Sequence, residues 1–411
     1  MIKRVVITGM GVVTSVGIRI KNFWESLVNG VSGVKRITRF GTEDFRTSVA
    51  AEVLDFDPKS YFSPQKIVVM DRFSQLALVA AIEAVDSSGL KISDENRQKI
   101  GVISGTTQGG INTIEEQYNV FFSKGLKYAD PMTAPKGMHV APASNIAITY
   151  RILGPNYTVS NTCSSGAVAI GEACRLIKHG YAEAMVCGGT DACITPALLG
   201  TWSKLRVLSA QNDPPERACK PFSKNRDGIV LGEGAGFVVL EELEQAKKRG
   251  ANIIAEVIGY GLSNDAYHLT FPSVEGETLA MRNALRDAGL SPEDVDYINA
   301  HGTGTQINDK GETEAIKRVF GDKSYAIPVS STKSMIGHTL GAAGAIEFIT
   351  SVLSIQHRII PPTVNYEVPD PECDLDYVPN KAREKELKVA LSNSFGFGCS
   401  NAVLICRKLY Y

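Results

Sequence analysis

Apolar segments alternate with glycine-rich polar turns along the chain, and two of these patterns occur twice. Residues 80–107 contain an apolar helix, a glycine stop and an apolar strand that ends in a glycine–threonine turn, and residues 279–305 repeat this order. A second repeat pairs residues 158–164 with residues 328–334, each predicted as a short strand, a polar turn and the start of a helix rich in small residues. Such units favour sheets flanked by helices. The sequence therefore predicts an internal duplication.

The duplication predicts an α/β protein of two similar halves, residues 1–250 and 251–411, packed about a pseudo-two-fold axis. In open α/β sheets, ligands collect where the ends of strands meet the starts of helices. The unusual residues of both repeats stand at these places, so we expect the chemistry there.

Composition narrows the class of protein. The 411 residues are 44% hydrophobic and include 38 glycines, which fits a large α/β core with many tight turns. The net charge of −1 does not suggest nucleic-acid binding. The N-terminal sequence lacks the pattern of a signal peptide, and no run of about 18 apolar residues predicts a membrane span. The eight cysteines form no Cys-x-x-Cys pair, so we expect reduced thiols in a cytoplasmic protein.

Cys163 is the first candidate for catalysis, because its turn, residues 160–166, stands between an apolar strand and the small-residue helix of residues 167–174. The positive end of a helix dipole lowers the pKa of a cysteine toward the thiolate. Small neighbours also let backbone N–H groups approach a bound carbonyl, as an oxyanion hole requires. A buried structural cysteine is the alternative, and we expect that role for the other seven.

Two histidines occupy similar glycine-rich turns. His301 follows a strand in His-Gly-Thr-Gly-Thr, and His338 follows Lys-Ser-Met-Ile-Gly. A histidine among small residues can stay neutral and donate a hydrogen bond to a developing negative charge. A buried Lys333 would need a carboxylate, and Glu347 is the nearest candidate in the sequence. The spacing of the thiol and the two imidazoles does not resemble a metal motif, so we expect no metal.

These motifs, together with Asn-Ser-Phe-Gly-Phe-Gly near the C-terminus, resemble the β-ketoacyl synthases of thiolase fold over essentially the whole chain. The resemblance is strongest to the elongating branch, which includes ketosynthase II of fatty-acid synthesis and the alpha subunits of type II polyketide synthases. It implies a five-layered α-β-α-β-α architecture and a decarboxylative Claisen condensation with malonyl-carrier.

The resemblance also implies roles for individual residues. Cys163 would take the acyl group from the phosphopantetheine of an acyl carrier protein. His301 and His338 would promote decarboxylation and stabilise the enolate, while Lys333 and Glu347 would orient and charge-balance the site. The remaining implied roles are backbone oxyanion donors at Cys163 and Phe397, a gating ring at Phe397, and contacts from Thr303 and Thr305 to the pantetheine arm. No cofactor would be bound, because the phosphopantetheine arrives on the carrier.

The sequence also departs from the pattern of fatty-acid synthases. Gln108 stands where ketosynthase II usually has an aliphatic residue lining the acyl pocket, and an unpaired amide there disfavours a saturated chain. Residues 65–69 replace a basic cluster that docks an acidic carrier. The basic residues that could dock the carrier instead are Lys66, Arg72, Lys204 and Arg206. These differences favour a ketosynthase of the type II polyketide kind, with fatty-acid ketosynthase II as the alternative.

Two further alternatives are weaker. A thiolase would carry a second cysteine before Gly-x-Gly near the C-terminus, where this chain has Phe395 and Phe397, with Cys399 only after them. A non-catalytic, chain-length-determining subunit would lack the nucleophile, which is present as Cys163. We expect a homodimer or a heterodimer with such a related subunit; the sequence does not identify the primer, the chain length or the carrier.

Overall fold

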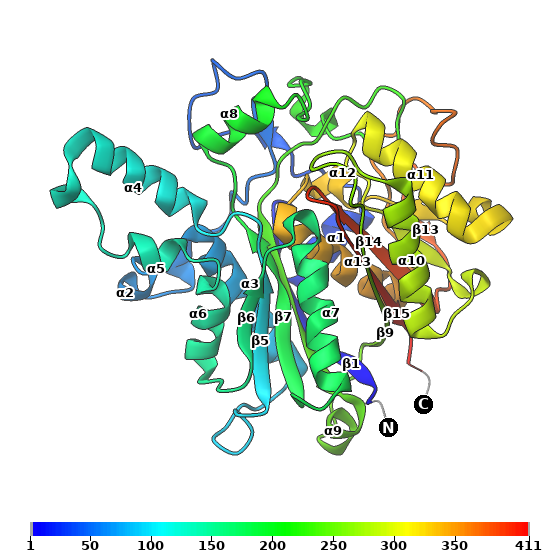
Figure 1. The fold of residues 1–411 in the computed structure, drawn as a ribbon, viewed down its shortest axis with the longest axis horizontal. Helices are drawn as coiled ribbons and strands as arrows, with labels where there is room; N and C mark the ends of the chain where they lie inside the picture. The colour runs from blue at the N-terminus through cyan, green and yellow to red at the C-terminus, as the bar shows by residue number, and fades with distance from the viewer. Residues whose placement is uncertain (1–2, 410–411) are drawn as a thin grey trace.

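Each of the two predicted halves contains a set of five strands, as a computed structural model of residues 3–409 shows (Figure 1). The first set comprises β1 (Val5–Thr14), β5 (Ile100–Gly105), β6 (Asn156–Val159), β7 (Ala184–Asp191) and β8 (Gly234–Glu242). The second set comprises β9 (Ala255–Asn264), β10 (Tyr297–Asn299), β11 (Val329–Ser330), β14 (Val389–Gly396) and β15 (Ser400–Arg407).

Both sets have the same topology. The first set lies in the order β6-β5-β7-β8-β1, and the second set in the order β11-β10-β14-β15-β9. In both sets, therefore, the strands lie in the order third, second, fourth, fifth and first along the chain. The second strand is parallel to the third and the fourth, and the remaining pairs are antiparallel, in both sets. The predicted duplication is therefore confirmed at the level of strand order and direction.

Helices cover both faces of each set and produce five layers. Helix α3 (Arg72–Ser88) and helix α6 (Ala141–Tyr150) pack on the outer face of the first set. Helices α7 (Ser165–Lys178) and α13 (Ala343–His357) lie in the middle, in contact with each other and with strands of both sets. Helix α10 (Val274–Ala288) covers the second set and contacts α11 (Gln306–Phe320). The predicted α-β-α-β-α architecture is confirmed.

The remaining elements are shorter or peripheral. The helices among them are α1 (Ile20–Val28), α2 (Pro64–Ile67), α4 (Ile111–Lys124), α5 (Thr133–Gly137), α8 (Pro196–Lys204), α9 (Leu243–Lys248) and α12 (Lys333–Ile336). The strands are β2 (Gly17–Ile18), β3 (Lys35–Arg36), β4 (Val49–Ala50), β12 (Ile359–Ile360) and β13 (Arg383–Glu384). Within residues 3–409, no helix is long and apolar enough to span a bilayer.

The two sets are joined along one seam. Val5–Ile7 of β1 pairs antiparallel with Ala255–Val257 of β9, so the strands form one continuous sheet of eleven, β2 included. The boundary expected at residues 250 and 251 falls in the loop between α9 and β9. That this boundary separates two domains stays a prediction.

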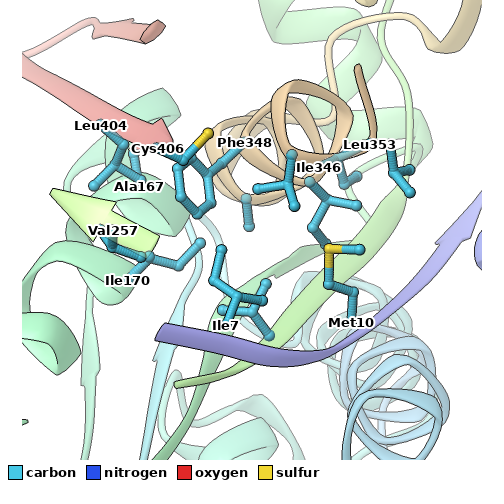
Figure 2. Packing of buried hydrophobic residues seen from close by; sticks show 14 of the residues in the cluster. Ile7, Met10, Ala167, Ile170, Val257, Ile346, Phe348, Leu353, Leu404 and Cys406 are labelled. Carbon is cyan, nitrogen blue, oxygen red and sulfur yellow. The ribbon is translucent and has the colours of Figure 1, made fainter. Parts of the chain in front are cut away.

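The largest core cluster fills the space between the sheet and the middle helices. Ile7 and Met10 of β1, Ile346 and Phe348 of α13, and Leu404 of β15 all belong to this cluster (Figure 2). Residues 343–355 of helix α13 are buried on all sides, and the hydroxyls of Thr350, Ser351 and Ser354 bond back to carbonyls of the helix, so these polar side chains can lie in the core. Both middle helices begin at the same end of the sheet, where the parallel strands β5, β7, β10 and β14 also end.

The second repeat differs from the sequence prediction. We expected one helix in this repeat, but α12 stops at Gly337, which has a φ of +66°. A short 3-10 helix, Leu340–Ala342, follows, and the α-helix begins at Ala343. The N–H of His338 donates instead to the oxygen of Val230, 2.7 Å away. The turn before the middle helix therefore spans residues 331–342 in the second half and only residues 160–164 in the first.

Candidate active site

Cys163 lies in a tight turn directly before α7. The turn is a short 3-10 helix, Thr162–Ser164, and Thr162 has the unusual φ of +49°. Thr107 and Ser165 fix the carbonyl of Thr162 by hydrogen bonds from their hydroxyls, at 3.0 and 2.7 Å. A Cβ on Gly166 would come within 2.8 Å of Ala345 N, so only glycine lets the two middle helices start this close together.

Burial outweighs the helix-start position of Cys163 in setting the pKa of its thiol. Burial raises its pKa to about 11. The positive charge of Lys333 and a backbone hydrogen bond from Phe397 lower the pKa, but by less than burial raises it. The sequence predicted a lowered pKa, and the direction is the opposite because the turn is buried: Cys163 is only 5% exposed.

The thiol and the two imidazoles come together as the sequence predicted. Ligand-type atoms of Cys163, His301 and His338 all lie within 4.8 Å of one another. The two imidazole rings are 5.3 Å apart at an interplanar angle of 83°. Cys163 comes from the first half and both histidines from the second, so the site lies where the two halves meet.

Hydrogen bonds assign the protons of both histidines. Nδ1 of His338 accepts from the backbone N–H of Leu340 at 3.2 Å. Nδ1 of His301 lies 3.2 Å from Nζ of Lys333, and an ammonium can only donate. Burial, with the charge of Lys333, lowers the pKa of both imidazoles well below its ordinary value, so both rings are neutral. Each ring therefore carries its proton on Nε2 and offers an N–H donor.

Lys333 has no exposed side-chain surface and uses all three of its protons. Besides Nδ1 of His301, it donates to the backbone oxygen of His301 at 2.6 Å and to Oε1 of Glu347 at 2.5 Å. Burial raises the pKa of Glu347 to about 7, although Lys333 lowers it. The predicted pairing of Lys333 with Glu347 is confirmed as a contact.

The proton positions argue against a metal at this cluster. A metal-binding histidine normally ligates through one nitrogen and donates the N–H of the other. Here the second nitrogen of His301 and of His338 accepts a hydrogen bond, which leaves the proton on the nitrogen that would have to ligate. The arrangement suits two hydrogen-bond donors beside a thiol, and it supports the prediction of no metal.

A cavity of about 240 Å³ contains the three residues. Thr303 and Thr305 also line it, at the turn where the resemblance places the pantetheine arm. The apolar side chains that line it are Trp202, Val207, Ile229, Leu269, Phe271, Ile307, Phe395 and Phe397. A mostly apolar cavity beside a thiol and N–H donors suits a thioester on a flexible arm.

Gln108 is not among the residues that line this cavity. Its backbone N–H donates to Asp191 at 3.3 Å, and its side chain is half-buried. Its expected contact with an acyl chain stays a prediction.

The four basic docking candidates do not share one surface. Arg72 donates twice to the buried carboxylate of Glu233, at 2.7 and 2.9 Å, so its guanidinium holds the fold together and its proposed docking role was wrong. Lys66 donates to the hydroxyl of Thr149 on α6 and does not line the cavity. Arg206 lines the cavity, and Lys204 is exposed two residues before it.

Three buried residues that sequence reasoning missed shape the turns. Asp191 accepts hydrogen bonds from Thr106, Thr107, Gln108 and Gly341 and so joins the turns of both halves. Glu312 accepts from the backbone N–H of His301 at 2.8 Å. Arg226 donates to the oxygen of Thr305 at 3.0 Å. For Asp191, the sequence did contain an indication, because a carboxylate at the end of an apolar strand, as in Thr190-Asp191, usually has a structural partner.

Comparisons with known proteins identify the family of the chain. Residues 2–246 match the family described as "Beta-ketoacyl synthase, N-terminal domain", and residues 254–367 match "Beta-ketoacyl synthase, C-terminal domain". A 3-oxoacyl-[acyl-carrier-protein] synthase 2 of Coxiella burnetii is 48% identical over 410 residues, which cover 99% of each chain.

Two solved structures are similar over the whole of both chains. The ishigamide ketosynthase/chain length factor superposes with a TM-score of 0.94 at 38% identity. A type II PKS ketosynthase, bound to the hexaketide and in complex with its acyl-carrier protein, superposes with a TM-score of 0.92 at 34% identity.

Fold, site and comparisons together define an acyltransferase of thiolase-like fold. The chain belongs to the β-ketoacyl synthase family.

Proposed function

We propose that the chain transfers an acyl group from an acyl carrier protein to Cys163 and condenses it with the malonyl unit of a second carrier. One observation carries the proposal: a buried thiol lies beside two imidazoles whose Nε2–H groups are both free to donate. Two preorganised donors are suited to the oxygen of an enolate, which gains negative charge as the malonyl unit loses carbon dioxide.

Acyl transfer is an exchange of thioesters. The sulfur of Cys163 bonds to the acyl carbon, the pantetheine sulfur leaves, and the proton of the Cys163 thiol passes to it. Because the pKa of Cys163 is raised to about 11, this proton departs during the attack and not before it. The backbone N–H groups of Cys163 and Phe397 stabilise the oxyanion of the tetrahedral intermediate.

Condensation follows in the same cavity. The bond between the malonyl methylene and its carboxylate breaks, carbon dioxide leaves, and the electron pair enters the enolate that His301 and His338 stabilise. The enolate carbon attacks the acyl carbonyl, and the sulfur of Cys163 leaves and takes up one proton. The product is longer by two carbons, and each turnover consumes one proton. The phosphopantetheine arm comes with the carrier, and no other cofactor takes part.

The pathway is the finer part of the proposal. The predicted contact of Gln108 with the acyl chain would favour a chain with β-keto oxygens, which a side-chain amide can pair. A saturated chain would leave the amide unpaired at about 1–3 kcal/mol. The similar polyketide ketosynthase structures support this type II polyketide role. Fatty-acid ketosynthase II remains the second candidate, since the relative named synthase 2 has the higher identity.

The partners follow from the same reasoning. The carrier would dock beside the cavity at Lys204 and Arg206, for which no ion pair is found within residues 3–409. A second subunit would add to the edge strand β6, which pairs only with β5 in the described chain. The exposed side chains of Ile148 and Leu153 stand beside that edge. The partner there is a second copy or a related chain-length-determining subunit.

The test measures intact mass after incubation with malonyl-carrier and with saturated or β-ketoacyl carriers. We expect acyl label on the peptide that holds Cys163, and condensation of β-keto chains at least several-fold faster than of saturated ones. Gln108→Ile should reverse this preference. Label on Cys399 or Cys219 would contradict the proposed nucleophile. Efficient elongation of saturated chains, unaltered by Gln108→Ile, would assign the fatty-acid role instead.

A further inference from the structure

The ring of Phe397 has one aromatic partner in the cavity, the indole of Trp202. The two rings are nearly parallel, with an interplanar angle of 11° and centroids 5.8 Å apart, and form an offset stack. Trp202 comes from α8, and Phe397 from the glycine-rich loop between β14 and β15. Both side chains are half-buried and line the cavity that contains Cys163.

The backbone of Phe397 is fixed independently of its ring. The hydroxyl of Thr162 donates to the oxygen of Phe397 at 2.5 Å, and the N–H of Phe397 forms a hydrogen bond with the thiol of Cys163. Gly396 and Gly398 flank it, so no neighbouring side chain in the loop limits rotation of the ring. The backbone can therefore stay in place for the oxyanion while the ring moves.

Helix α8 is well suited to hold the indole still. Thr195 caps its N-terminus by accepting the N–H of Leu198, and Leu199 is fully buried in a cluster that also contains Cys163. Trp202 is therefore attached to the packed part of the site, whereas Phe397 belongs to a loop.

We propose that Trp202 is a positioning residue that holds the ring of Phe397 in the passage to Cys163 and so sets how readily acyl groups and other electrophiles reach the thiol. This inference deepens the proposed function where acyl groups are concerned, but control of access to the thiol does not depend on it. Loss of the indole should raise the rate at which electrophiles react with Cys163 by about 2- to 12-fold. This range follows from the usual strength of an aromatic pair.

The test compares Trp202→Ala with Trp202→Phe, which retains a stacking ring. The alkylation rate of Cys163 is measured by peptide mass mapping with a small reagent, iodoacetamide, and a larger one, N-phenylmaleimide. We expect Trp202→Ala to raise the rate by about 2- to 12-fold, more for the larger reagent. Trp202→Phe should stay near the wild-type rate. Buried Cys373 reports general loosening of the fold.

The outcomes separate this inference from the proposed function. Unchanged rates with both reagents, or an equal rise at Cys373, would overturn the inference. Acyl loading of Cys163 from carriers is measured on the same variants, and we expect a parallel rise in Trp202→Ala. If the alkylation rates change as expected but no carrier loads Cys163 in any variant, the control of access by Trp202 stands and the proposed acyl transfer fails.

Discussion

Nζ of Lys333 lies 2.6 Å from the backbone oxygen of His301 and 3.2 Å from Nδ1 of the same residue. One side chain thus fixes both the position of this imidazole and the nitrogen that carries its proton. The third proton of the ammonium goes to Glu347, so the donor property of His301 depends on a buried ion pair that does not touch the cavity.

Lys333→Met should destabilise the fold in a pH-dependent way. Removing the cation raises the pKa of Glu347 above its present value of about 7, itself above the ordinary 4.5. A carboxyl with a raised pKa in the folded state favours folding at low pH, and this contribution is lost as pH rises through the folded pKa. We expect a loss of about 3–5 kcal/mol at pH 8 and a smaller loss at pH 6, measured by urea unfolding.

A matched double variant checks the cause. Lys333→Met with Glu347→Leu removes the uncompensated carboxylate and should recover most of the stability, without the pH dependence. Equal instability of the single and double variants at both pH values would mean that lost packing, and not the buried charge, explains the effect.

Cys163→Ala should separate the two half-reactions. The variant cannot hold an acyl group, so condensation should be abolished, whereas both imidazole donors remain and carbon dioxide should still be released from malonyl-carrier. Product mass and released carbon dioxide are measured on the same sample. Loss of both activities in a variant that unfolds like the wild type would mean that the thiol itself takes part in decarboxylation.

The histidine donors are tested by decarboxylation in the Cys163→Ala background. His338→Ala removes a donor to the enolate oxygen and should slow carbon dioxide release by at least about 100-fold. His301→Ala should act similarly. His179→Ala, at an exposed position after α7, is the matched control and should have no effect. Normal decarboxylation by both active-site variants would exclude the roles given to these histidines.

The two kinds of titrating group predict different pH profiles. Burial lowers the pKa of His301 and His338, so decarboxylation should show no fall between pH 8 and pH 6.5, where an ordinary histidine begins to gain a proton. Burial raises the pKa of Cys163 to about 11, so its alkylation should rise about tenfold per pH unit from pH 7 to 10. A plateau in alkylation near pH 8 would show an activated thiolate instead.

Carrier docking is tested by removing both cations beside the cavity. Lys204→Ala with Arg206→Ala should raise KM for carrier-bound substrates about tenfold at low salt and less at high salt, because exposed charges are screened. Small pantetheine thioesters should react as before. Lys91→Ala, exposed near the other end of the first-half strands, is the control. An equal effect on free thioesters would show damage to the cavity instead.

Much of this arrangement could be predicted from the sequence, because polar residues at strand ends of a duplicated α/β pattern must meet at one edge. Cys163, His301 and His338 were found in this way, and the structure brings them together. The single helix expected in the second repeat is interrupted, because Gly337 takes a positive φ and the N–H of His338 bonds to Val230. Hydrophobic periodicity does not report such long-range backbone bonds.

The remaining differences have similar causes. The raised pKa of Cys163 reflects burial by distant segments, which local helix-start chemistry could not reveal. The contacts of Asp191, Glu312 and Trp202 join residues far apart in sequence. Arg72 was placed on a docking surface because its partner, Glu233, lies 161 residues away.

The seam between β1 and β9 has a consequence for how the chain could be divided. A cut in the loop between α9 and β9 would leave each fragment with a complete five-strand set and one newly uncovered edge, and these edges match each other in register. Neither fragment alone would hold the thiol and both imidazoles. The seam should therefore allow the two fragments to reassemble, and activity should return only when they are mixed.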